Sequence, residues 1–226
     1  KNESSYVNYT DAVVTTLESG KGYRAGTVEG SNLTFTGTVA SGMINVDITV
    51  TDAIYSEWNL IGNPYPSYLD MELFLNYIID DSTDPVTTNL SILENTSGIF
   101  GYVGNGMSGI WGIITLANAS STLMTPGQGF FVAANDAYVE DYDIVFDESM
   151  RAIGDNDDFI LGRTASDLTF LKLNMSTNDK GYTTEFYFNA NSSRGLDLGY
   201  DGKFLGNNAP DFSVYSHLVE DNEGLP

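Results

Sequence analysis

The sequence predicts an all-β protein: an antiparallel β-sandwich of jelly-roll type with one short helix, followed by a second, smaller or incomplete β-sandwich unit. Three observations support this class. The chain is rich in Tyr (14) and Phe (12), which favour strands. Apolar and polar side chains alternate in several short runs, the pattern of a strand with one buried face. Gly, Asn, Asp and Ser separate these runs, and these residues favour turns.

The first predicted element is a β-hairpin close to the N-terminus. Residues 31–39 (SNLTFTGTV) and 43–51 (MINVDITVT) each alternate apolar and polar side chains. Only Ala40, Ser41 and Gly42 separate the two runs, a length typical of a hairpin connection. We therefore expect these runs to pair as antiparallel strands with one buried face.

Residues 58–70 (WNLIGNPYPSYLD) predict a strand that leads through a tight corner into the helix. The strand is expected to end at Ile61, because Gly62 permits a tight turn and the prolines that follow favour extended backbone before them. Apolar residues then recur near helical spacing between residues 66 and 80. Ser67 precedes most of this run and is the expected N-cap of the helix.

Later strands and a domain boundary follow from the same patterns. Further strands are predicted at residues 129–134, 143–149, 168–175 and 182–190. The alternation stops between Met150 and Asp167, where Asp, Asn and Gly cluster. We therefore expect a β-sandwich domain over residues 1–160 and a second β unit over residues 161–226. The second unit ends without a closing strand, so we expect it to be truncated at its C-terminus.

The composition disfavours several functional classes. The chain has 31 acidic and 9 basic residues, a net charge of −22, which disfavours binding to nucleic acid and to anionic membranes. It has no cysteine, so disulfides, thiolate nucleophiles and thiolate zinc sites are excluded. Its one histidine, His217, is too few for a His-rich metal site. No apolar run reaches the length of about 18 residues that a membrane-spanning helix requires.

Clustered carboxylates are one set of candidate binding residues. Hard cations such as Ca²⁺ prefer several oxygen ligands, which closely spaced Asp residues can supply. The alternatives are solvated acidic loops and, within residues 195–202, Asp side chains that cap turns by accepting hydrogen bonds from backbone N–H groups. The sequence establishes no cofactor, and calcium is the one candidate ligand of these carboxylates. Its candidate ligands are Asp155, Asp157, Asp158, Asp197 and Asp201.

Aromatic side chains are the second set of candidates. Trp and Tyr rings pack well on pyranose rings, so an exposed group of them would bind a polysaccharide. The alternative is that these rings belong to the core, as most aromatic residues of a β-rich protein do. The candidate platform consists of Trp58, Tyr65, Tyr68 and Trp111. No catalytic residue is assigned, because 31 acidic residues always include a pair with glycosidase spacing, and His217 lies near no nucleophile motif.

Several segments occur together in a familiar order. They are GKGYRAG, LTFTGTVASGMINVDIT, WNLIGNPYPSYLD, TPGQGFFV, VFDESMR, RGLDLGYDGKF and FSVYSHL. This series resembles the non-catalytic β-rich region near the C-terminus of many large secreted proteins of Bacteroidota, which precedes the sorting domain of the type IX secretion system. The resemblance extends from about Gly20 to Pro226.

The resemblance implies a secreted protein, exported across the outer membrane and displayed on the bacterial cell surface or released from it. It implies a structural or adhesive module without catalysis of its own. The alternative is a carbohydrate-binding module attached to a polysaccharide-degrading enzyme. Expected partners are other domains of the same polypeptide, and polysaccharides or cell-surface glycans. Neither nucleic acid nor direct insertion into a membrane is expected.

Overall fold

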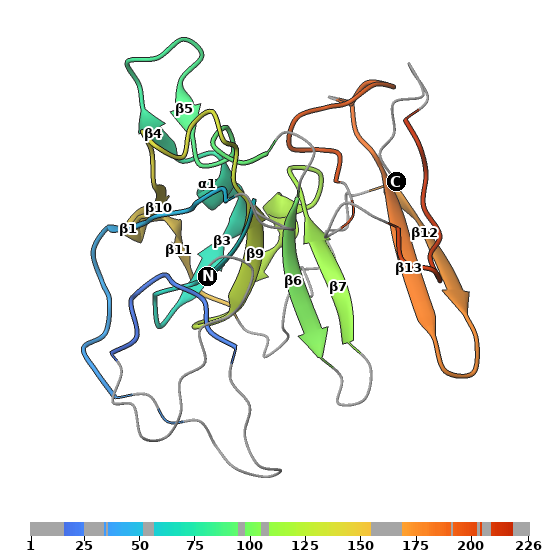
Figure 1. Ribbon diagram of the computed structural model, residues 1–226, viewed down its shortest axis with the longest axis horizontal. Helices are drawn as coiled ribbons and strands as arrows, with labels where there is room; N and C mark the ends of the chain where they lie inside the picture. The colour runs from blue at the N-terminus through green and yellow to red at the C-terminus, as the bar shows by residue number, and fades with distance from the viewer. Residues whose placement is uncertain are drawn as a thin grey trace.

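The fold is all-β, as predicted, with every strand pair antiparallel (Figure 1). The computed structural model describes residues 16–24, 34, 36–51, 57–94, 98–104, 109–154, 169–190, 192–202, 204 and 209–218. The described part contains one α-helix, α1 (Met71–Leu75), and two 3-10 turns, η1 (Ala119–Ser121) and η2 (Glu148–Met150). None of these helices is long and apolar enough to cross a membrane.

The described part of the chain contains thirteen strands, most of them short. In chain order they are β1 (Ile44–Val46), β2 (Trp58–Gly62), β3 (Tyr68–Asp70), β4 (Ile78–Asp80), β5 (Thr87–Thr88), β6 (Ile99–Gly104), β7 (Gly109–Ile114), β8 (Leu123–Met124), β9 (Gly129–Ala133), β10 (Ile144–Phe146), β11 (Arg151–Ala152), β12 (Thr169–Ser176) and β13 (Gly181–Phe188). The largest sheet has the order β2-β9-β6-β7, and a second has the order β11-β3-β8. The remaining sheets are the pairs β1-β10, β4-β5 and β12-β13.

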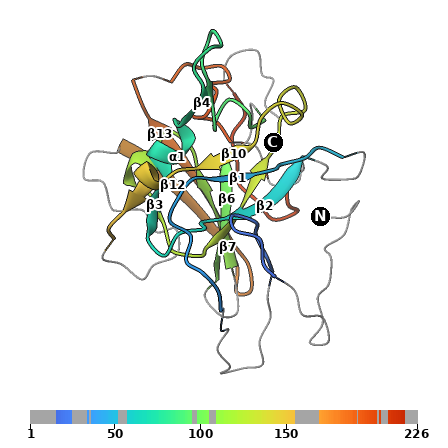
Figure 2. The ribbon, with the colours of Figure 1, turned by 90° about the vertical axis from the view of Figure 1, so that its left-hand side faces the viewer.

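The main hydrophobic core lies where the two larger sheets, the β1-β10 pair and α1 meet. Phe74 of α1 is fully buried, with its ring centroid 5.2 Å from that of Phe146 and 5.8 Å from that of Phe130. Figure 2 shows β1 and β10 side by side next to α1. The short helix therefore contributes three buried side chains, those of Met71, Phe74 and Leu75, and it closes one side of the core.

The predicted corner after β2 is present, and the side chain of Asn63 holds it. Its Nδ2 donates to the carbonyl oxygens of Ser67 (2.9 Å) and Thr125 (3.0 Å), and its Oδ1 accepts from the backbone N–H of Tyr65 (3.0 Å). The predicted N-cap was wrong: α1 begins only at Met71, after β3. Asp70, not Ser67, caps the helix, because its carboxylate accepts from the first free N–H groups.

The predicted N-terminal hairpin was also wrong in its pairing. The strand in the second run is β1, and it pairs with β10, with Ile44 opposite Phe146. No strand is assigned to the described residues between 34 and 43, and residues 31–33 and 35 lie outside the described residues. Val46 and Ile48 are buried as the alternation predicts. Alternation identifies the buried face of a strand but not its partner, which explains the error.

The four later strands are confirmed as β9, β10, β12 and β13. Sequence patterns missed β3 to β8 and β11, which are short or rich in Gly, and β3 and β4 occupy the two ends of the run predicted as helical. Residues 155–168 lie outside the described residues, and they include the expected domain boundary. The division into two domains therefore stays a prediction.

Candidate functional site

The β12-β13 hairpin has two chemically different faces. Residues directly opposite each other in the register share a face, so Leu171 lies beside Phe186, and Lys172 beside Glu185. One face, here called the apolar hairpin face, carries the large side chains of Leu171, Leu173, Met175, Tyr182, Phe186 and Phe188. The other face is polar apart from its aromatic pair, and it carries Phe170, Lys172, Asn174, Thr183, Glu185 and Tyr187.

The polar face makes several contacts within the protein, and Phe170 on it is 48% exposed. Lys172 Nζ lies 2.7 Å from Glu185 Oε1, and the rings of Phe170 and Tyr187 stack with centroids 5.7 Å apart. Tyr187 donates its hydroxyl proton to Glu185 and accepts from Asn118 Nδ2 (3.2 Å), which ties the hairpin to the end of the β6-β7 pair. Burial, and then the hydrogen bond to Glu185, raise the pKa of Tyr187 to about 12.

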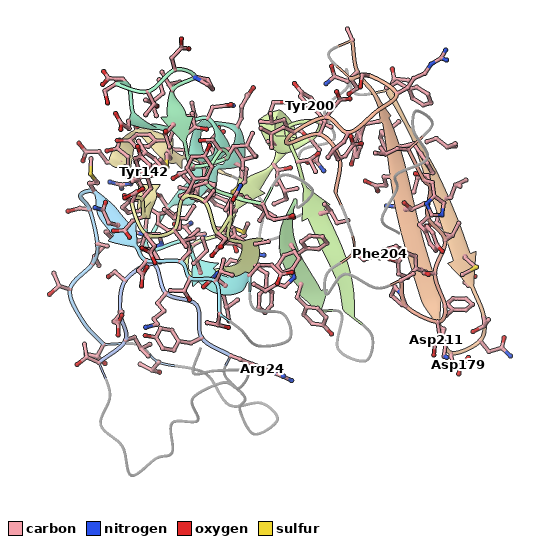
Figure 3. The ribbon with its side chains drawn as sticks, turned by 45° about the horizontal axis from the view of Figure 1, so that its top comes forward. Arg24, Tyr142, Asp179, Tyr200, Phe204 and Asp211 are labelled. Carbon is pink, nitrogen blue, oxygen red and sulfur yellow. The ribbon has the colours of Figure 1, made fainter. Side chains whose placement is uncertain are left out.

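Among the described residues, aromatic rings cover the apolar hairpin face at its turn end. There the Tyr182 ring lies 6.2 Å from that of Phe204, which in turn lies 5.2 Å from that of Tyr215. Figure 3 shows Phe204 alongside the hairpin and Asp179 at its turn. Toward the other end, Leu171 is 49% exposed and Phe188 is 66% exposed. In the described part of the chain, β12 and β13 pair only with each other, so the outer edge of each strand is open.

The predicted calcium ligands Asp197 and Asp201 close a turn. Asp201 Oδ2 accepts from the backbone N–H of Asp197 (2.7 Å), and the Asp197 carboxylate accepts from the N–H of Ser193. Burial raises the pKa of Asp201; the hydrogen bond from Asp197 opposes this rise and the charge of Asp197 adds to it. This geometry matches the turn-capping alternative. Asp155, Asp157 and Asp158 lie outside the described residues. Among the described residues, no group of three or more His, Asp or Glu side chains is arranged to hold a metal ion.

This turn packs the part of the chain after the β12-β13 hairpin against residues that precede the hairpin, Leu90 and Leu116. Gly199, at its centre, is buried and has a φ of +77°, and its carbonyl oxygen accepts from the N–H of Leu116 (2.6 Å). A Cβ at this position would lie 2.7 Å from Leu90 Cδ2, which is too close for a real contact. The RGLDLGYDGKF segment is therefore a structural joint.

The four predicted platform residues do not form an exposed group. Trp58 is 3% exposed and its ring meets Phe100 edge to face, with centroids 5.3 Å apart. Tyr65 is 2% exposed, and its hydroxyl donates to the carbonyl oxygen of Gly42 (2.9 Å). Both rings belong to the core, so neither offers a face to a sugar. Tyr68 is half-buried, with its ring against the backbone of Gly154. Trp111 lies in β7, and its side chain is outside the described residues.

A shallow pocket lies beside β11, where sequence reasoning identified no site. It measures about 320 Å³ and is lined by Ser67, Glu148, Arg151, Ala152 and Ile153. The β3-β11 pairing, with Leu69 opposite Arg151, brings its two distant segments together. Arg151 Nε donates to Ser67 Oγ (3.1 Å), and its guanidinium carbon lies 5.7 Å from the centroid of the Tyr65 ring. No local sequence pattern signals this pairing.

Comparison with known proteins gives one match. A family model described as "Domain of unknown function (DUF8693)" matches residues 1–224. No curated protein and no solved structure matches the chain.

Proposed function

The chain belongs to the DUF8693 family of domains of unknown function, and we propose that it is a non-catalytic structural or adhesive module of a secreted protein on the bacterial cell surface. In this proposal the type IX secretion system exports the protein. The apolar hairpin face packs against another domain of the same polypeptide. The observation that carries the proposal is the exposure of this face on a hairpin whose outer edges are unpaired in the described part of the chain.

Physical reasoning links that observation to a docking role. A two-stranded hairpin is marginally stable on its own in water. Here the polar face contacts the end of the β6-β7 pair through the hydrogen bond between Asn118 and Tyr187. Leu171 and Phe188 stay exposed on the other face. Contiguous apolar surface on a soluble protein marks an interaction site, and open strand edges accept a further strand from a partner. A neighbouring domain that adds a strand would pair with the backbone groups of one edge and cover the apolar face.

Charge supports the location on an outer surface. A net charge of −22 keeps an exported domain soluble and discourages non-specific association with anionic lipid or nucleic acid. The order of segments that resembles the Bacteroidota region includes the structural joint around Gly199 and the corner held by Asn63. These segments have structural roles in the fold, in keeping with a non-catalytic module.

Hydrogen exchange tests the docking. Amides of residues 169–188 are measured by mass spectrometry in the 226-residue chain and in the natural polypeptide that carries it. We expect slower exchange in the natural polypeptide, while exchange in residues 129–146 stays the same. The paired change Leu171→Ser and Phe188→Ser is expected to remove the protection. The control is Leu17→Ser, a leucine of similar exposure (44%) far along the chain. Equal exchange in the two proteins would overturn the docking.

Cell fractionation tests the export. A Bacteroidota host is made to express the natural polypeptide, with and without a working type IX secretion system. We expect the protein on the cell surface or in the medium only when the system works. Its presence there when the system is inactive, or its retention inside the cell in both strains, would contradict this part of the proposal.

A further inference from the structure

We propose that the pocket beside β11, here called the Arg151 pocket, binds a neutral saccharide unit through Arg151 and Glu148. The pocket lies at the β3-β11 pair, away from the hairpin, so this site is independent of the docking proposed above. Its volume of about 320 Å³ falls at the lower end of the range of roughly 300–1,000 Å³ for small-ligand sites. That size suits one sugar ring.

Arg151 is held in place before any ligand arrives. Its Nε donates to Ser67 Oγ at 3.1 Å, and its guanidinium lies over the ring of Tyr65. Tyr65 is itself fixed, because it is buried and its hydroxyl donates to the carbonyl oxygen of Gly42. In the described part of the chain Arg151 forms no ion pair. The N–H groups on its two terminal nitrogens therefore remain to donate to a ligand in a fixed orientation.

The other walls of the pocket complement these donors. The carboxylate of Glu148, when ionised, only accepts hydrogen bonds. Ile153 is 94% exposed, an unusual state for an isoleucine, and it forms an apolar edge. A sugar hydroxyl both accepts and donates, and the C–H face of a sugar ring is apolar. A saccharide would accept from Arg151, donate to Glu148 and pack its ring against Ile153.

The surrounding charge favours a neutral ligand over an acidic one. Burial raises the pKa of Tyr65 to about 12, and the negative charges of Asp147 and Glu148 add to this rise. Arg151 lies over the ring of Tyr65, so both carboxylates are near the pocket. The whole chain carries a net charge of −22. A carboxylate ligand would gain one arginine but would meet two nearby carboxylates and a repulsive field. A neutral saccharide keeps the hydrogen bonds to Arg151 without that repulsion.

A nuclear magnetic resonance titration tests the site. The ¹⁵N-labelled chain is titrated separately with the methyl glycosides of glucose, galactose, mannose and xylose. We expect at least one of them to shift the amides of Ser67 and residues 151–153 saturably, with a Kd on the order of 1 mM because the pocket is open. Amides of the β12-β13 hairpin are expected to stay unchanged.

Matched variants identify the groups that bind. Arg151→Lys keeps the charge but loses the fork of donors, and we expect binding at least about tenfold weaker, whereas Arg194→Lys leaves it unchanged. Glu148→Gln is expected to weaken binding, and Glu72→Gln is its control. Ile153→Ser removes the apolar edge. Because Ile153 is 94% exposed, this variant keeps the test valid even where changes at Arg151 disturb the fold.

Several results would overturn the proposal. One is that none of the four methyl glycosides shifts these amides. A second is that sodium acetate or methyl galacturonate binds there while the neutral glycosides do not, which would make the pocket a carboxylate site. A third is that both Arg151→Lys and Ile153→Ser bind the glycoside as tightly as the unmodified chain.

Discussion

Replacement of Asn89 by Ala is expected to destabilise the fold more than any exposed change. Asn89 is fully buried, and its Nδ2 donates to the carbonyl oxygens of Phe74 and Val145, both at 2.8 Å. Its Oδ1 accepts from the N–H of Val145 at 2.9 Å. Among the described strands β10 pairs only with β1, so the Asn89 amide bonds its other edge as a neighbouring strand would. The same side chain connects that edge to the end of α1.

The size of the effect follows from the bonds that are lost. Asn89→Ala leaves the N–H and the carbonyl oxygen of Val145 without their partner, whereas the carbonyl oxygen of Phe74 still accepts from Tyr77 N–H (3.5 Å). A buried polar group that loses its partner costs about 1–3 kcal/mol. Partial relaxation and entry of water reduce the sum for the two Val145 groups, so we expect a loss of about 2–5 kcal/mol in the free energy of unfolding. Since domains have about 5–15 kcal/mol in total, this loss is a large fraction of the stability.

Urea unfolding, followed by tryptophan fluorescence and by circular dichroism, measures this loss. Trp58 is a suitable reporter because it is 3% exposed and becomes solvated on unfolding. The control is Asn45→Ala, an exposed asparagine of β1, for which we expect a change within about 0.5 kcal/mol. A loss below about 1 kcal/mol for Asn89→Ala would refute the reasoning, because it would mean that the two Val145 groups find other partners.

Three further changes have expected outcomes. Asp70→Ala removes the cap that accepts from Glu72 N–H and Leu73 N–H, and it should cost about 1 kcal/mol in urea unfolding. Gly199→Ala should cost about 2–4 kcal/mol, because it combines a φ of +77° with a clash, whereas Gly195→Ala, with nothing closer than 3.8 Å, should cost far less. Asp201→Asn should raise Tm at pH 7 by roughly 1–3 °C. Burial raises the pKa of Asp201 above 3.8, so its contribution to stability is full below that pH and is lost as pH rises through the folded-state value. The gain from Asn should therefore vanish near pH 3, and an equal gain at both pH values would contradict this cause.

Residue patterns predicted the strands whose signal is local. Residues 168–175 and 182–190 alternate, the second run is rich in Thr and aromatic residues, and the two runs form β12 and β13. The corner after Ile61 followed from Gly62 and the prolines in the same way. By contrast, the partner of β1 lies about a hundred residues away in β10. Such pairing depends on how the whole core packs, which a period-two pattern does not encode.

The candidate sites show the same limit. Trp58 and Tyr65 looked suitable for a ligand platform because aromatic residues serve both cores and binding surfaces. Trp58 packs against Phe100 and Tyr65 bonds to Gly42, so both rings belong to the core. Neither partner is near in sequence. Arg151 and Ser67 meet only through the β3-β11 pairing. A single arginine within an acidic run carries no sequence signal for the pocket that it lines.

Asparagine side chains connect several of the short strands to other segments of the fold. Sequence patterns assign Asn to turns, yet Asn63 and Asn89 are buried and bond several backbone groups each. Asn59 bonds both the N–H (3.1 Å) and the carbonyl oxygen (2.9 Å) of Thr49, as a residue of a paired strand would. The carboxamide has the donor and the acceptor of a peptide group, so it can replace a missing strand. Strands of two to five residues, too short for long ladders, are thereby joined across segments distant in the chain. The fold therefore depends on a few internal amides, whereas exposed asparagines such as Asn45 are free to vary.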